Sequence, residues 1–116
     1  MIHQHGVTGI VNFWRHDPRL PSLVDYYRHY PFPDGKHVPD GVIEVASEAT
    51  DHVRSGGVIV SMCWGGRNRS GLVAALIVRS LTGCSGPQSC EIVRAARPGA
   101  LFNDSFVDFL MQLKAP

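Results

Sequence analysis

The sequence has no excess of charge of either sign and no long apolar run. Eleven Lys and Arg residues stand against ten Asp and Glu residues, so the formal net charge is +1. This balance gives no reason to expect a nucleic-acid partner or a membrane-surface protein. The longest apolar stretch, residues 72–78, is shorter than the roughly 20 residues that span a bilayer. We therefore expect no membrane anchor.

Cysteine is also scarce. The chain has three cysteines, Cys63, Cys84 and Cys90, and it opens on Met-Ile-His-Gln-His, which lacks the basic and apolar regions of a secretory signal. This usage is typical of reduced thiols. We therefore expect a cytoplasmic protein in which Cys84 and Cys90 are structural. His3 and His5 stand without further ligands nearby in sequence, so we expect no metal and no cofactor.

Length and composition predict one folded domain. A chain of 116 residues can build one hydrophobic core but not two. Its 44% of hydrophobic and 18% of charged residues are ordinary for a globular protein. No repeat, low-complexity segment or Gly/Ser linker divides the sequence. We expect residues 1–116 to form a single domain and the protein to be a monomer.

The order of the periodic segments predicts an α/β fold, with a small, mainly parallel central sheet flanked by helices. Residues 7–14 and 58–60 predict strands, the second covered on both faces. Residues 31–39 hold three prolines and a glycine and predict an irregular loop. Apolar residues at helical spacing predict four helices: residues 42–53, capped by Asp40; residues 70–81, apolar nearly all round, central and ended by Gly83; residues 87–97, with Cys90, Ile92, Val93 and Ala96 facing inward; and a last helix capped near Asn103 or Asp104.

The loop between the second predicted strand and the central helix can bind phosphate. Backbone N–H groups of a glycine-containing loop converge on phosphate oxygens, and the start of a helix adds partial positive charge. Arg69 can clamp two of the oxygens, and the same positive field favours the thiolate form of Cys63. We predict a nucleophilic Cys63 and a loop that binds phosphate, sulfate or vanadate, formed by Trp64, Gly65, Gly66, Arg67, Asn68 and Arg69.

This segment, followed by Ser70 and Gly71, resembles the C-x5-R-S/T-G signature of protein tyrosine phosphatases. Gly66 falls on the glycine of C-x-x-G-x-x-R. Residues 9–12 (GIVN), 31–35 (PFPDG) and 93–106 are similar to the dual-specificity branch of that superfamily, so the resemblance covers nearly the whole chain. It implies a dual-specificity phosphatase-like fold, here with a shortened N-terminus.

The resemblance implies phosphomonoester hydrolysis through a cysteinyl-phosphate intermediate. Cys63 would be the nucleophile and Arg69 the phosphate clamp. Ser70 would hydrogen-bond the departing sulfur. Asp34, in the proline-rich loop, would protonate the leaving oxygen, and Asp40 is the rival acid although it also suits a helix cap.

Several alternatives stay open at this point. The substrate is a phosphotyrosine or phosphoserine/threonine protein, a phosphoinositide headgroup, for which Arg67 would be a second cation, or an RNA 5′ end. Met62 stands where the family usually has histidine and cannot make that histidine's hydrogen bonds, which supports the alternative of a catalytically weak, phosphate-binding pseudophosphatase. The presence of the nucleophile, the clamp, the hydroxyl and the acid together favours an enzyme: Cys63, Arg69, Ser70 and Asp34. A rhodanese-type sulfurtransferase is the weaker alternative, because Arg69 and Asp34 fit phosphate better.

Overall fold

The computed structural model describes residues 6–63 and 67–116. Within them the elements are, in order, β1 (Gly9–Asn12), the short 3-10 helix η2 (Pro21–Leu23), β2 (Tyr26–His29), α1 (Val42–Arg54), β3 (Ile59–Met62), α2 (Arg69–Thr82), α3 (Gly86–Ala96) and α4 (Asp104–Met111). The strands form one parallel sheet in the order β2-β1-β3, in which Gly9 pairs with Tyr26 on one side and Ile59 on the other. The predicted α/β fold with a small parallel sheet is confirmed.

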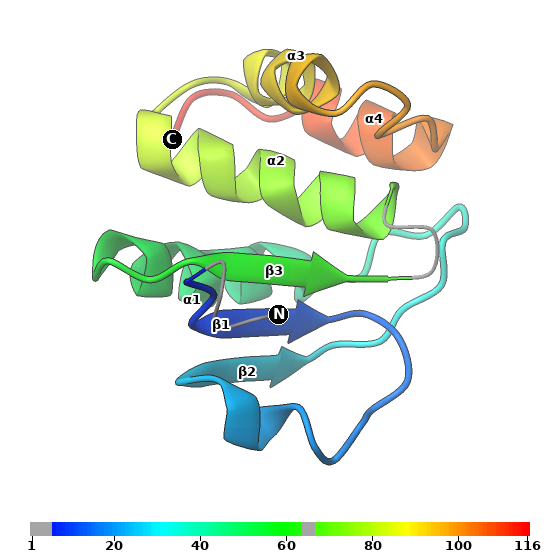
Figure 1. Ribbon diagram of the computed structural model, residues 1–116. Coiled ribbons are helices and arrows are strands. Elements are labelled where there is room, and N and C mark those ends of the chain that lie inside the picture. The colour runs from blue at the N-terminus through cyan, green and yellow to red at the C-terminus, as the bar shows by residue number, and fades with distance from the viewer. Residues whose placement is uncertain (1–5, 64–66) are drawn as a thin grey trace.

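The helices cover the sheet in layers (Figure 1). α1 lies behind the sheet in this view, where Tyr26 of β2 stacks on His52 of α1 with ring centroids 5.2 Å apart. Burial and the nearby Glu48 carboxylate raise the pKa of Tyr26 to about 12, so its hydroxyl stays protonated and donates to Glu48. α2 lies along β3 and packs on α1, and α3 and α4 pack on α2. No helix in the described part of the chain has the length and apolarity to cross a membrane.

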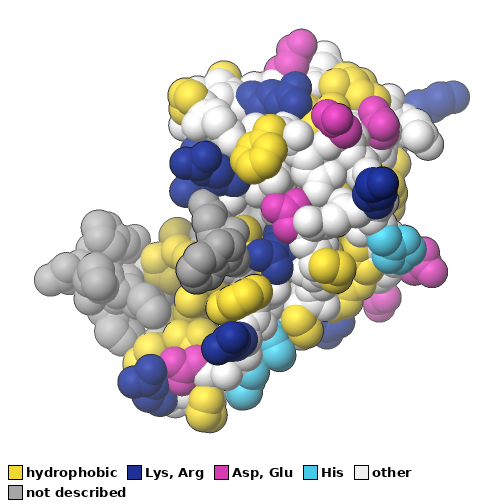
Figure 2. Space-filling model, turned by 90° about the vertical axis from the view of Figure 1, so that its right-hand side faces the viewer, with side chains coloured by type: hydrophobic (Ala, Val, Ile, Leu, Met, Phe, Trp, Pro, Cys, Tyr) yellow, Lys and Arg dark blue, Asp and Glu magenta, His cyan; other side chains and the backbone are white. Residues whose placement is uncertain are grey.

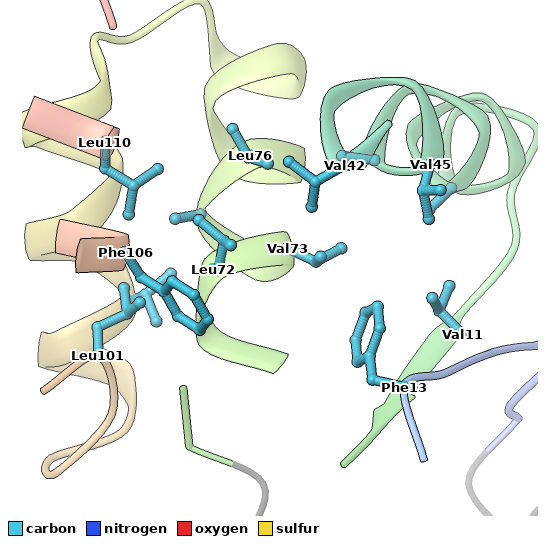
Figure 3. Close-up of a cluster of buried hydrophobic side chains, with 14 of the residues drawn as sticks. Val11, Phe13, Val42, Val45, Leu72, Val73, Leu76, Leu101, Phe106 and Leu110 are labelled. Carbon is cyan, nitrogen blue, oxygen red and sulfur yellow. The ribbon is translucent and has the colours of Figure 1, made fainter. Parts of the chain in front are cut away.

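α2 forms the centre of the hydrophobic core, as its apolar surface predicts (Figure 3). It separates two groups of buried side chains. One group comes from β1, the residue that follows it, and α1: Val11, Phe13, Val42 and Val45. The other comes from α4 and the loop that precedes it: Leu101, Phe106 and Leu110. The helix ends as predicted at Gly83, whose φ of 75° is left-handed and favours glycine.

β2 is an addition to the predicted strands. Its four residues, Tyr26–His29, are all half-buried, so the segment lacks the alternation of apolar and polar residues that marks a strand in sequence. Pairing with β1 along its whole length holds it extended. Strand formation here is therefore a consequence of tertiary structure.

Two predictions about the middle of the chain are wrong. β3 is not covered on both faces, because Val60 and Met62 are 40% and 37% exposed and alternate with half-buried Ile59 and Ser61. α1 begins at Val42 with Gly41 in the N-cap position, so Asp40 does not cap it. The chain reaches this helix through a turn in which the N–H of Val42 donates to the carbonyl of Pro39.

The predicted inward face of α3 is also partly wrong. Cys90 and Val93 are buried, but Ile92 and Ala96 are exposed. Among the described residues α3 packs mainly against α2 and α4, so a narrow stripe of its surface is covered. The helix begins at Gly86, where Ser85 and Gln88 form a capping box.

Phe106→Ala should lower the free energy of unfolding by about 3–5 kcal/mol, because the side chain is fully buried and its removal leaves a cavity against Phe32. Phe102→Ala is the matched control. It makes the same change at a side chain that is 62% exposed, and its effect should stay within about 0.5 kcal/mol. Urea denaturation followed by circular dichroism measures both. Equal losses in the two variants would contradict the packing described.

Candidate active site

The carboxyl ends of β1 and β3 meet the amino end of α2 at one edge of the sheet, on the right in Figure 1. The N–H of Phe13 donates to the carbonyl of Met62 over 2.7 Å, so pairing continues up to the residue before Cys63. The Cys63 Sγ lies 3.0 Å from the Ser70 Oγ in the first turn of α2. The two ends of the predicted phosphate loop are therefore in contact. Trp64, Gly65 and Gly66, which the sequence assigns to this loop, lie outside the described residues.

Arg69 is the first residue of α2 and is only 6% exposed. Its Nη1 donates to the carbonyl of Phe32 over 3.0 Å and to that of Phe13 over 3.4 Å. Its Nε is buried and has no hydrogen-bond partner among the described residues. A buried charged donor without a partner is costly. Arg69 thus holds a donor that an anion could satisfy, six positions after Cys63 in the chain.

Cys63 packs against the hydrophobic core but is not fully enclosed by it. Cys63 is partly exposed and lines a pocket of about 510 Å³ together with Met62 and the loop that follows β1. Basic, acidic and hydrophobic side chains are interspersed over this end of the molecule (Figure 2). The residues that line the pocket besides Cys63 and Met62 are Asn12, Trp14, Arg15, His16, Asp17, Pro18, Arg19 and Leu20.

Asp17 lies in the same pocket as Cys63, although the sequence gives no reason to single it out. The side chain of Arg19 donates to its carboxylate over 2.8 Å and the backbone N–H of Arg19 over 2.9 Å. These hydrogen bonds lower the pKa of Asp17 to about 2. Asp17 is therefore ionised at neutral pH and has no proton to deliver, so it is a poor candidate for a general acid.

Asp34 is exposed, and amide groups bind both of its carboxylate oxygens. Asn68 Nδ2 donates to Oδ2 over 2.8 Å, and Asn103 Nδ2 donates to Oδ1 over 2.6 Å. Asp34 lines a second pocket, of about 420 Å³, with these two residues, and not the pocket that Cys63 lines. The structure thus brings Asp34 to the residue next to Arg69. The rival acid, Asp40, is exposed.

The sequence places Asn68 in the phosphate loop but gives no sign of its contact with Asp34. Asn68 occupies the N-cap position of α2, and an asparagine there is expected to cap the helix. Its side chain makes no such bond and contacts Asp34, Phe102 and Asn103 instead. Asn103 caps α4 as predicted, by accepting from the N–H of Phe106. Its second role, the bond to Asp34, is also invisible in the sequence.

The other candidate residues contribute less to the site. Arg67 is exposed, and its carbonyl accepts from the N–H of Leu101. All three cysteines are free thiols, with Cys90 buried and Cys84 half-buried. Nowhere in residues 6–63 and 67–116 do three His, Cys, Asp or Glu side chains gather as metal ligands would.

Comparison with solved structures identifies the class of fold. A mouse putative dual specificity phosphatase complexed with zinc tungstate is 27% identical, with a TM-score of 0.80 over 96% of this chain and 71% of that one. Human DUSP28 is 25% identical, with a TM-score of 0.79 over 96% of this chain and 76% of that one. Tk-PTP in the active form is 25% identical, with a TM-score of 0.77 over 94% and 79%.

No protein-family model and no curated protein matches the sequence. The structural neighbours nevertheless confirm the resemblance that the C-x5-R-S-G loop predicts. This chain has a dual-specificity phosphatase-like fold of the protein tyrosine phosphatase superfamily.

Iodoacetate should alkylate Cys63 at least about tenfold faster than Cys84, although both thiols are partly exposed. The reason is that the Cys63 sulfur lies 3.0 Å from the Ser70 hydroxyl in the first turn of α2, and the partial positive charge of a helix start attracts an anionic reagent. Peptide mass spectrometry of the labelled protein measures both rates. Inorganic phosphate should protect Cys63 and leave Cys84 unaffected. Equal rates, or equal protection, would argue against an anion site at Cys63.

Proposed function

We propose that this chain is a cysteine-dependent phosphomonoester hydrolase that acts through a cysteinyl-phosphate intermediate. One observation carries the proposal: Cys63 lines a pocket, and its sulfur contacts the hydroxyl of Ser70, which directly follows the buried Arg69 at the start of α2. A nucleophile, a cation for the phosphoryl oxygens and a helix start are then available at one place. The similarity in fold to dual-specificity phosphatases supports the same reaction class.

The reaction has two steps in this proposal. In the first, the Cys63 thiolate attacks phosphorus, the bond from phosphorus to the leaving oxygen breaks, and Asp34 gives that oxygen a proton. In the second, water attacks phosphorus and gives a proton to Asp34, and the sulfur leaves as a thiolate. The Ser70 hydroxyl, 3.0 Å from the sulfur, stabilises the departing thiolate by a hydrogen bond. Arg69 balances the charge of the phosphoryl oxygens in both steps.

The proposed substrates are phosphotyrosine or phosphoserine/threonine proteins. The pocket that Cys63 lines supports an aryl phosphate in particular, because Trp14, Pro18 and Leu20 offer apolar surface in the same pocket. Phosphoinositide headgroups are the alternative substrate, for which the exposed Arg67 and Arg15 could bind a second phosphate. A panel of phosphopeptides and phosphoinositides distinguishes the two classes.

A phosphate-binding pseudophosphatase is the second candidate function. Met62 supports it, since this side chain stands beside the nucleophile and cannot supply the hydrogen bonds of a histidine. Such a protein would bind phosphate or vanadate at Arg69 but release no phosphate from an ester. A turnover assay therefore separates the two functions.

The protein should hydrolyse p-nitrophenyl phosphate, and vanadate should inhibit it by mimicking pentacoordinate phosphorus. Cys63→Ser should reduce kcat by at least about 10³-fold, because the nucleophile is lost. Cys84→Ser is the control and should retain full activity, since Cys84 lies outside the site. Release of p-nitrophenolate measures turnover. Activity that survives in Cys63→Ser, or cyanide-dependent sulfur transfer from thiosulfate in its place, would refute the proposal.

Asp34→Asn should lower kcat by about 10²- to 10⁴-fold, because the leaving oxygen then departs unprotonated. Binding of vanadate should persist, since Arg69 and Cys63 are unchanged. Asp40→Asn removes the same charge from the other exposed carboxyl of this segment and should change kcat by less than about twofold. The reverse result, a loss in Asp40→Asn alone, would move the acid role to Asp40.

A further inference from the structure

The start of α2 holds the loop of residues 31–39 at two consecutive positions. Arg69 Nη1 donates to the carbonyl of Phe32 over 3.0 Å, and Asn68 Nδ2 donates to Asp34 Oδ2 over 2.8 Å. The candidate phosphate clamp and the candidate acid are thus joined through adjacent residues of one helix start. Two attachment points fix both the position and the direction of the Asp34 carboxyl group.

The side chain of Asn68 has a single orientation consistent with its surroundings. It is only 3% exposed, and its Oδ1 accepts from the backbone N–H groups of Phe102 and Asn103, each over 2.9 Å. Because two backbone donors face Oδ1, the NH₂ group must point the other way, to the carboxylate of Asp34. Asn68 therefore connects the start of α2, the acid-bearing loop and the segment before α4.

Asn103 is the second residue whose amide group binds Asp34. Its Nδ2 donates to Asp34 Oδ1 over 2.6 Å and to the carbonyl of Gly35 over 2.9 Å, while its Oδ1 caps α4. Both carboxylate oxygens of Asp34 are therefore held by neutral amides. Neutral donors orient the group without the full positive charge of an arginine or lysine, and each oxygen keeps a lone pair for the transferred proton.

We propose that Asn68 is a positioning residue for proton transfer: together with Asn103, it holds the Asp34 carboxyl group in a fixed position relative to Arg69. The inference rests on the proposed function, since it requires that Asp34 protonates the leaving oxygen. It goes further by giving a role in that step to a residue of the phosphate loop that touches neither the nucleophile nor the leaving group. Small displacements of such an acid are costly, up to about 10²-fold in rate for an error of 1 Å.

The test uses two variants at Asn68 and two substrates. Asn68→Asp keeps an oxygen for the N–H groups of Phe102 and Asn103 but cannot donate to Asp34. Asn68→Ser also removes the amide donor and adds no charge. Phenyl phosphate has a poor leaving group that needs a proton, whereas difluoromethylumbelliferyl phosphate has a good one that does not.

Both variants should lower kcat for phenyl phosphate by about 10- to 10²-fold and for the activated ester by less than about threefold. In the Asp34→Asn background, neither substitution should lower kcat for phenyl phosphate further, because the positioned group is already absent. Asn103→Asp keeps the cap of α4 and should show the same selectivity to a smaller extent.

Three results would overturn the positioning role while leaving the hydrolase intact. These are equal losses on both substrates, a gain in kcat when the amide is removed, and a full additional loss in the Asp34→Asn background. Circular dichroism and vanadate inhibition of each variant show that it is folded with a working phosphate site. Failure of the proposed function gives a different pattern, because the wild-type chain then shows no Cys63-dependent hydrolysis even of the activated ester, and both proposals fall.

Discussion

The buried guanidinium of Arg69 organises the end of the fold where β1 and β3 meet the start of α2. Arg69 donates through Nη1 to the carbonyls of Phe13, at the end of β1, and Phe32, in the loop before α1. These bonds tie a strand, a loop and α2 together. Its Nε has no partner within the described residues, so the bonding of the side chain is incomplete. A buried charged donor without a partner lowers stability. An anion bound at the start of α2 would complete the bonding of Arg69.

Aromatic packing explains how a loop rich in prolines can supply fixed contacts. Phe32 is buried and lies edge-on to Phe13 and Phe106, with ring centroids 5.5 Å and 6.0 Å away. Its side chain anchors the loop in the core, and its carbonyl is thereby presented to Arg69. The loop then needs only local polar bonds, from Asn68 and Asn103, to orient Asp34. Apolar packing sets the position of the loop, and amides set the direction of the acid.

The sequence predicts the parts of this arrangement that depend on local periodicity and spacing. The central α2 and its end at Gly83 follow from the apolar pattern and the glycine. The contact of Cys63 with Ser70 is implied by the resemblance to the phosphatase signature. β2 is not predicted from the sequence, because its extended conformation and half-buried residues depend on pairing with β1. The hydrogen bonds of the Asn68 side chain are not predicted either, since they join segments that are far apart in the chain. Asparagine has the same local preferences whether it caps a helix or crosses to another loop.

Met62 is the clearest departure from the phosphatase pattern. Its expected effect on the rate of hydrolysis can be judged from the other contacts that hold the loop in place. The carbonyl of Met62 continues the pairing with β1, and the side chain is 37% exposed and has no strong donor or acceptor. Each missing hydrogen bond is worth about 0.5–1.5 kcal/mol, or up to roughly a tenfold change in rate. The Ser70 contact and the bonds of Asn68 remain to order the two ends of the loop. Loss of a general acid costs about 10²- to 10⁴-fold. Under the proposed mechanism, loss of the Asp34 carboxyl group would therefore slow hydrolysis of an ester with a poor leaving group more than one lost hydrogen bond at residue 62 does.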